Sequence, residues 1–243
     1  AFLSGGVDSS TIAALMQEQS SKKIKTFSIG FEDKRYNEAE HAKLVANHLG
    51  TDHHDMYVSS KDALNVLPLL PDMFDEPFAD SSQIPMYLVS KIAKSKVTVC
   101  LSGDGGDELF GGYNRYLVTS KLWSKISKIP RSAKGVLAYL IKSVKPSVWD
   151  KISDLLYNNK YSGFGFKLHK GADSLHSKNI DDLYFNLIST IKNPAEWLIS
   201  SEEHSRPNYN FDPKISGIER MMIKDLVGYL PTDILTKVDR TSM

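Results

Sequence analysis

The stretch "FLSGGVDSS" (residues 2–10) decides how the beginning of this 243-residue chain is expected to fold. An apolar pair runs directly into two adjacent glycines, an acid and hydroxyl side chains, a pattern typical of a strand that turns into a helix. The glycines let backbone N–H groups approach an oxyanion closely, and the helix N-terminus adds partial positive charge. The stretch holds no lysine, so a bound polyphosphate would need Mg²⁺, for which Asp8 is the available carboxylate. The alternative is an ordinary glycine turn in which Asp8 or Ser9 caps the helix.

A second glycine-rich stretch, "LSGDGGDELFGGY" (residues 101–113), follows an apolar run. Its acids Asp104, Asp107 and Glu108 could ligate a hard cation, which prefers oxygen ligands. The alternative is an acidic helix N-terminus with a glycine-rich exit, which leaves the paired glycines unexplained. If the two preceding strands end side by side, Asp8 and Asp107 face each other across one crevice and can share Mg²⁺ on a nucleotide.

Strand and helix patterns alternate over the first 112 residues. We expect strands at residues 1–4, 23–31, 53–59 and 97–103, and helices at residues 8–19, 37–49 and 85–95, the second helix being closed by Gly50. Repeated strand–helix units indicate an α/β fold with a parallel sheet that is covered on both faces. Sites on such sheets lie at the carboxyl ends of the strands, where both glycine-rich stretches fall.

After Tyr113 the patterns are mainly helical, without a convincing strand. Residues 217–230 form a good amphipathic helix, which we expect Pro231 to stop. We therefore divide the chain into a nucleotide-binding core (1–115), a mainly helical lobe (116–212) and a helical return segment (213–243). Both ends look cut, so we expect the chain to be a piece of a longer protein.

Composition limits the classes of protein to consider. Hydrophobic residues make up 41% of the chain, enough for a sizeable core, and a formal net charge of +1 gives no general attraction to nucleic acid or anionic membranes. The single cysteine, Cys100, excludes an intrachain disulfide and a cysteine-based zinc site, is typical of a reducing compartment, and is expected in the core. No apolar run of about 18 residues occurs, so we expect no membrane span and a cytoplasmic location.

Two further features have unremarkable interpretations. His53 and His54 are adjacent on a predicted strand and should point to opposite faces, so both cannot easily bind one ion. His41 and His48 share a helix face but have no third ligand nearby. Residues 121–145 contain several lysines and no acid, which indicates a solvated lobe surface, with an anionic surface or an RNA contact as the alternative.

The two glycine-rich stretches carry a family resemblance. "SGGVDSS" (residues 4–10) resembles the SGGxDS motif of the ATP pyrophosphatase superfamily, whose members cleave ATP between the α and β phosphates to adenylate a substrate. "LSGDGGDELFGGY", together with "DEPFADSSQIPMYLVS" (75–90) and "DILTKVDRTSM" (233–243), is similar to the synthetase domain of the glutamine-hydrolysing asparagine synthetase B family. The resemblance covers nearly the whole chain, is weakest between about 120 and 210, and implies a Rossmann-like ATP pyrophosphatase core.

The resemblance implies roles for individual residues. It places ATP and Mg²⁺ at this site, with the pyrophosphate wrapped by Ser4, Gly5, Gly6, Asp8 and Ser9. It implies Mg²⁺ ligands at Asp8 and Asp107, and nucleotide contacts from Phe2, Leu3, Ile29, Ser102 and Gly103. Asp104 falls where the best-studied members carry Glu, a side chain longer by one methylene. Lys237 and Arg240 are the basic residues placed to meet the triphosphate, while Asp80, Ser81 and Ser82 could read the amino acid substrate.

The reaction implied by the resemblance is the adenylation of aspartate, followed by attack of ammonia to give asparagine. In the family, an N-terminal glutaminase domain supplies the ammonia from glutamine, and nothing in this chain matches that domain. One alternative keeps the chemistry with another carboxylate, such as a sugar uronate or a natural-product acid. Alternatives of other classes are a tRNA-modifying adenylase and an inactive scaffold. A homodimer is one assembly to consider, and nucleic acid is not the expected partner.

Overall fold

The computed structural model describes residues 1–32, 37–157, 163–189, 191 and 209–243. The chain divides into two compact units, each of which is described by itself. Unit 1 consists of Ala1–Gly112 and Lys224–Met243, so a segment from the end of the chain joins the N-terminal part. Unit 2 consists of Tyr113–Ile223.

The centre of unit 1 is a small parallel sheet. Strands β1 (Lys25–Phe31) and β2 (Asp52–Val58) pair in parallel, with Phe27 opposite His54. On the other side of β1, Phe2 forms a parallel bridge with Phe27, and the N–H of Leu3 donates to the carbonyl of Phe27 at 2.8 Å. The N–H of Phe2 donates to the carbonyl of Leu101 at 2.8 Å, which brings residues 97–103 beside the start of the chain. The predicted strands at 23–31 and 53–59, and their parallel pairing, are confirmed.

The strands predicted at residues 1–4 and 97–103 are wrong in this structure. The first segment forms one bridge only, and the second reaches the sheet through the single carbonyl of Leu101. Cys100 packs beneath Phe27, while Val99 and Leu101 are 77% and 47% exposed rather than buried. This run reaches the sheet through one backbone hydrogen bond and keeps Val99 and Leu101 exposed, so it does not form the doubly buried strand that its composition indicates.

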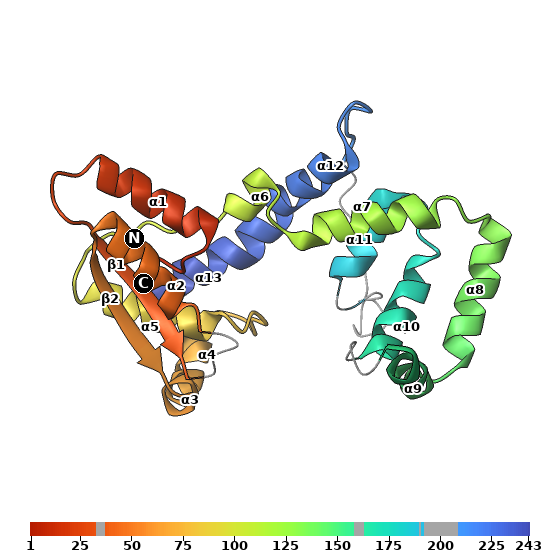
Figure 1. Cartoon of the computed structure of the whole chain (residues 1–243), viewed down its shortest axis with the longest axis horizontal. Helices are drawn as coiled ribbons and strands as arrows, with labels where there is room; N and C mark the ends of the chain where they lie inside the picture. The colour runs from red at the N-terminus through yellow and green to blue at the C-terminus, as the bar shows by residue number, and fades with distance from the viewer. Residues whose placement is uncertain (33–36, 158–162, 190, 192–208) are drawn as a thin grey trace. The chain divides into compact units, whose positions relative to one another are not determined.

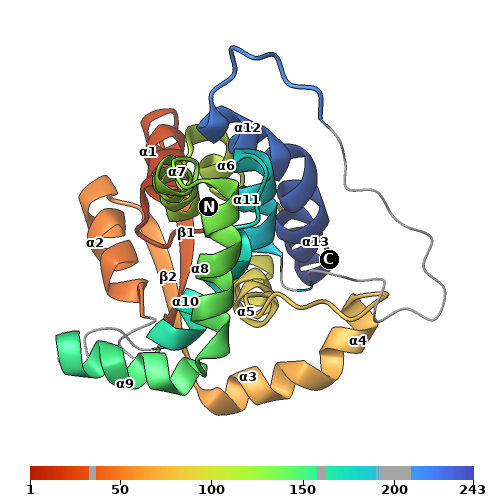
Figure 2. The same cartoon turned by 90° about the vertical axis from the view of Figure 1, so that its right-hand side faces the viewer.

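Helices cover both faces of the sheet (Figure 2). Helices α1 (Val7–Glu18) and α2 (Ala39–Leu49) enclose a cluster with Leu3, whereas α5 (Gln83–Lys94) packs against Phe27 on the opposite face. The first cluster is built from alanines, which let the helices approach closely: Ala13, Ala42 and Ala46. The predicted helices at 8–19, 37–49 and 85–95 are confirmed, as is Gly50 as the left-handed residue that ends α2.

The two strand histidines lie on opposite faces, as predicted. His53 Nδ1 lies 2.9 Å from Thr26 Oγ1 and its Nε2 lies 3.2 Å from Ser28 Oγ, whereas the ring of His54 stacks on Phe27. Burial lowers the pKa of His53 below its ordinary value. The polar neighbours of His53 therefore satisfy a neutral ring inside the fold, which is a structural role.

The remaining helices of unit 1 surround these layers. They are α3 (Ser60–Val66), the 3₁₀ turn η1 (Leu67–Leu69), α4 (Leu70–Met73), α6 (Gly106–Phe110), the π-helix η3 (Asp225–Ile234) and α13 (Leu235–Ser242). The helix α12 (Gly217–Lys224) leads into η3 without a break. Pro231 therefore does not stop this helix, and that prediction is wrong. Proline lacks the N–H of an α-helical bond and crowds the preceding turn, and the wider i→i+5 turn of η3 accommodates it.

Unit 2 is helical over its described residues (Figure 1), as predicted. Its helices are α7 (Asn114–Ile126), α8 (Arg131–Ser143), α9 (Pro146–Tyr157), α10 (Phe164–Ser174), α11 (Ile180–Ile188) and most of α12. The basic stretch lies mainly on α7 and α8, where Lys142 pairs with Asp173 and Lys134 lies over the Trp123 ring. No helix in the described ranges is long and apolar enough to cross a membrane.

Replacing Phe27 with alanine should destabilise unit 1 selectively. The Phe27 side chain is fully buried between β1 and α5, so its removal should lower the free energy of unfolding by about 3–5 kcal/mol. Phe166→Ala is the matched control, because that ring is 70% exposed and should change stability by about 0.5 kcal/mol or less. Native-state hydrogen exchange measures both effects, at the β1 amides for Phe27→Ala and at the α10 amides for Phe166→Ala. Equal losses in the two variants would contradict this assignment of the core.

Candidate active site

The first glycine-rich loop closes on itself through serine hydroxyls. The Oγ atoms of Ser4 and Ser9 lie 3.0 Å apart, and the N–H of Gly6 donates to Ser4 Oγ at 3.2 Å. Gly5 has φ 84°, and a Cβ there would lie 2.8 Å from the backbone nitrogen of Ala42 in α2. Because both the backbone angle and the space favour glycine, this turn is held in one shape against α2.

Asp8 lies inside the first turn of α1 and does not cap it. The N-cap of α1 is Gly6, which makes no side-chain capping bond, and Ser9 Oγ donates back to the Gly6 carbonyl at 3.3 Å. The alternative that Asp8 or Ser9 is an ordinary N-cap is therefore wrong. The Asp8 carboxylate instead lines a cavity of unit 1.

The second glycine-rich loop lies directly against the first. A Cβ on Gly106 would lie 2.6 Å from Cγ of Asp8, and a Cβ on Gly103 would lie 2.9 Å from the backbone nitrogen of Ser9. Each contact leaves room only for the hydrogen of glycine unless its neighbour moves. Gly103 and Gly106 thus have a steric purpose: they let the two loops meet, and Asp107 follows at the start of α6.

The two loops form part of a cavity of about 1370 Å³ in unit 1. Pockets for one small molecule usually measure about 300–1,000 Å³, so this cavity has room for more than one ligand. The predicted site residues that line it are Phe2, Leu3, Ser4, Gly6, Asp8, Ser9, Ile29, Ser102, Gly103, Asp104, Asp107 and Lys237. Gly5 and Arg240 are not among the lining residues.

The charge of the cavity wall is strongly unbalanced. Lys237 is the one basic residue among the described residues that line it. Five carboxylates line the same space: Asp8, Glu32, Glu38, Asp104 and Asp107. In the described part of the chain, no three or more His, Cys, Asp or Glu side chains gather into a metal site. A divalent cation here would therefore need ligand oxygens from a substrate or water, as Mg²⁺ on a polyphosphate has.

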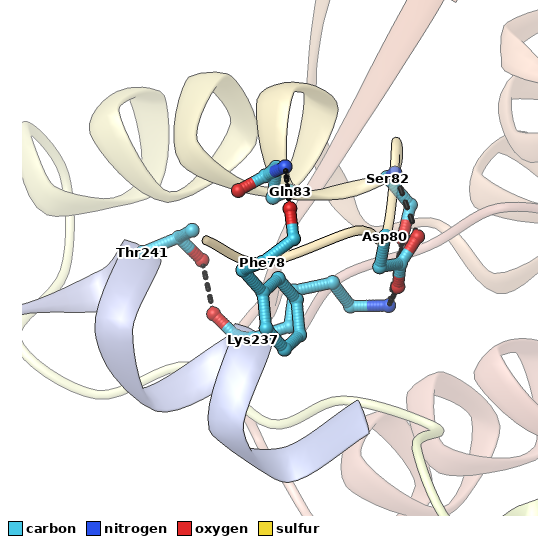
Figure 3. A network of polar contacts seen from close by, with 6 residues as sticks. All are labelled: Phe78, Asp80, Ser82, Gln83, Lys237 and Thr241. Atoms are coloured by element: carbon cyan, nitrogen blue, oxygen red, sulfur yellow. Dashed lines mark hydrogen bonds and ion pairs between the residues drawn. The ribbon is translucent and has the colours of Figure 1, made fainter. Parts of the chain in front are cut away.

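Lys237 is already engaged by the loop before α5 (Figure 3). Its Nζ donates to Asp80 Oδ2 and to Ser82 Oγ, both at 2.8 Å, and the residue is only 8% exposed. Burial alone would raise the pKa of Asp80, but the hydrogen bonds from Lys237 and Ser82 outweigh it and hold that pKa below its ordinary value. This partly buried ion pair holds in place the one cation of the described cavity wall.

Arg240 has a different partner, away from the cavity wall. Its guanidinium donates to Asp75 Oδ2 at 2.6 Å, and the side chains of both residues are solvent-accessible, at 39% and 80%. Asp104 remains at the wall, on an exposed turn between Gly103 and Gly105. The C-terminal helix α13 thus presents Lys237 to the cavity and Arg240 to an exposed acid.

Part of the cavity wall was not predicted from the sequence. It comes from the middle and the carboxyl end of β1, from the carboxyl end of β2 and from the start of α5: Ser28, Phe31, Glu32, Val58, Ser59, Ser60 and Met86. Applying the strand-end rule to β1 and β2 would have identified the five that lie at or just after a strand end, Phe31, Glu32, Val58, Ser59 and Ser60. Phe110 also lines the cavity and is 83% exposed.

Comparison with known proteins identifies the family. Residues 1–243 match the family model described as asparagine synthase. The chain is 32% identical over 248 residues to the glutamine-hydrolysing asparagine synthetase 1 of Bacillus subtilis, a match that covers 100% of this chain and 36% of that protein. It is 42% identical over 252 residues to a Mycobacterium bovis protein named "Putative asparagine synthetase", covering 100% of this chain and 35% of that protein. The chain thus spans about a third of the length of these curated relatives, and it belongs to the asparagine synthase family.

Proposed function

We propose that unit 1 has the ATP pyrophosphatase fold and that the whole protein converts aspartate to asparagine. The side-chain carboxylate of aspartate attacks the α-phosphorus of ATP, which forms β-aspartyl-AMP and releases pyrophosphate. Ammonia then attacks the acyl carbon, AMP leaves, and an amide is formed. Aspartate, ATP and ammonia therefore give asparagine, AMP and pyrophosphate. In this proposal the core (1–115) and the return segment (213–243) form the site, and the lobe (116–212) is a separate part.

The observation that carries this proposal is the charge of the cavity beside the two glycine-rich loops. In the described part of the wall, five carboxylates face one ammonium, which is itself paired with Asp80, so these side chains cannot hold a polyphosphate by charge alone. We assign Asp8 and Asp107 as the ligands of Mg²⁺. When bound, Mg²⁺ neutralises phosphate charge and so allows an anionic carboxylate to approach the α-phosphate. This assignment explains why an ATP site of this kind lacks the lysine of an ordinary phosphate loop.

The remaining residues of the cavity then have distinct tasks. Ser4, Gly5, Gly6 and Ser9 wrap the pyrophosphate with hydroxyls and backbone N–H groups, and the N-terminus of α1 adds partial positive charge. Phe2, Leu3 and Ile29 give apolar contacts to adenine and ribose, while Ser102 and Gly103 hold the nucleotide.

The acid and the two cations act around the reacting centre. Lys237 stabilises the leaving pyrophosphate, and Asp104 acts near the acyl-adenylate. We assign Arg240 to the triphosphate as well, which requires it to leave Asp75 when ATP binds. Ammonia comes from glutamine through an N-terminal glutaminase domain of the whole protein, and we place the reaction in the cytoplasm. The source of ammonia rests on the family resemblance, and the location rests on the single cysteine.

Product analysis of the full-length protein tests this proposal. With ATP, Mg²⁺, ammonia and aspartate, we expect AMP, pyrophosphate and asparagine in equal amounts, measured by chromatography and mass spectrometry. Omission of Mg²⁺ should abolish all three. Formation of ADP and phosphate in place of AMP and pyrophosphate would contradict the proposed bond cleavage. If AMP appears only with a sugar uronate or another carboxylate, the assignment of aspartate as the acceptor is wrong. If AMP forms with no carboxylate, the result favours the inactive-scaffold alternative.

Replacing Gly106 with alanine should disturb the proposed metal ligand. The added Cβ would lie 2.6 Å from Cγ of Asp8, so the carboxylate must move. We expect a loss of about 10- to 100-fold in carboxylate-dependent pyrophosphate release, since an ångström of misplacement has costs of this order, and a higher Mg²⁺ requirement. Gly135→Ala is the matched control, because no atom lies within 4 Å of a Cβ there and α8 should be stabilised slightly. The metal assignment is refuted if the two variants show the same activity and the same Mg²⁺ dependence.

A further inference from the structure

The Asp80–Lys237 ion pair joins two segments that are 157 residues apart in the chain. Asp80 lies in the loop that precedes α5, and Lys237 lies on α13 (Figure 3). Lys237 and Ser82 line the cavity, whereas Asp80, the other member of the pair, is not among its lining residues. The contact therefore decides where the single basic group of the described wall is held.

Asp80 is surrounded by donors from the protein itself. Its Oδ1 accepts the N–H and the hydroxyl of Ser82 at 2.8 and 2.7 Å, and its Oδ2 accepts Lys237 Nζ at 2.8 Å. The Ser82 hydroxyl also lies 2.7 Å from Oδ2 and 2.8 Å from Lys237 Nζ, which closes a ring of three side chains. A carboxylate held in this way is arranged to orient an ammonium group rather than to receive one from a substrate.

Both ends of the ion pair are fixed in place. Gln83 Nε2 donates to the carbonyl of Phe78 at 3.0 Å, which ties the loop around Asp80 to the start of α5 (Figure 3). Thr241 Oγ1 donates to the carbonyl of Lys237 at 2.7 Å within α13. The Lys237 stem is nearly buried, so its rotamers are restricted before any substrate arrives.

Resting on the proposed function, we infer that Asp80 is a positioning residue: it holds the Lys237 ammonium at the cavity wall, where that cation stabilises leaving pyrophosphate. Asp80 itself does not contact the substrates. This differs from the sequence-based hypothesis that Asp80 reads the amino acid. The loop before α5 thus sets the position of the Lys237 ammonium on α13. Misplacement of this ammonium by about an ångström would strongly reduce the rate of adenylation.

Kinetics of Asp80→Asn in the full-length protein test the catalytic half of this inference. The variant keeps the size of the side chain but loses the charge that orients Lys237. We expect kcat for carboxylate-dependent pyrophosphate release to fall about 10- to 100-fold, while KM for ATP changes less than about threefold. Asp80→Glu, which restores the charge, should recover part of kcat. A raised KM with unchanged kcat would instead mean that Asp80 contributes to binding ATP, and would overturn the inference.

Asp173→Asn is the matched control, because it removes an Asp–Lys pair with Lys142 that lies in unit 2 and is partly exposed. Exposed pairs contribute little, so its kcat should stay within about twofold of the wild type. An equal loss of kcat in Asp173→Asn and Asp80→Asn would show a general effect on folding, which contradicts a positioning role.

The reactivity of the Lys237 amine tests the structural half without any turnover. Reductive methylation with formaldehyde, followed by peptide mass spectrometry, should modify Lys237 at least about fivefold faster in Asp80→Asn, because the amine is released from its partners. In Asp173→Asn the rate at Lys237 should be unchanged. An unchanged rate in Asp80→Asn would overturn the inference. If the wild type releases no pyrophosphate with any carboxylate, the proposed function is overturned. In that case the methylation rates by themselves still test whether Asp80 holds Lys237.

Discussion

The contact between Gly106 and the Asp8 carboxylate is the constraint on which the site depends. It can form only because Gly103 and Gly106 lack side chains, so that the second loop reaches the backbone and acid of the first. Gly5 makes the same kind of approach to α2 from the other side. Two loops far apart in sequence are thus brought to one edge of the sheet. There the carbonyls of Phe27 and Leu101 accept backbone hydrogen bonds from Leu3 and Phe2, and Phe2 forms a parallel bridge with Phe27. A side chain at Gly103 or Gly106 would displace Asp8 or its backbone, and a side chain at Gly5 would meet the backbone of α2.

This close contact concentrates negative charge at the cavity wall. The described cavity wall has one basic side chain, supplied by the C-terminal helix α13, and that side chain is itself paired with Asp80. The wall is therefore suited to a polyanion that arrives with its own divalent cation. The same reasoning explains why the return of residues 224–243 to unit 1 matters: without this segment the described wall would have no cation.

The sequence was sufficient for the strands and helices that follow a clear period. Helices α1, α2 and α5 and strands β1 and β2 were predicted; α2 and α5 carry apolar residues at helical spacing, and Gly50 marks the end of α2. The edge segment at 97–103 was mispredicted, since its composition does not reveal that one face would stay exposed. Pro231 was mispredicted because a rule for α-helices was applied to a stretch that forms a π-helix. The glycine motifs located the cavity, but nothing in the sequence pattern could reveal that Asp80 would pair with Lys237.

The central claim is that this cavity adenylates a carboxylate, and transfer of an oxygen label tests it most directly. Full-length protein would be incubated with ATP, Mg²⁺, ammonia and aspartate that carries ¹⁸O in its side-chain carboxylate. Attack of that carboxylate on the α-phosphorus predicts one ¹⁸O atom in each AMP, because the bridging oxygen stays with phosphorus when ammonia displaces AMP. Mass spectrometry of AMP that shows no label while asparagine is formed would contradict the account.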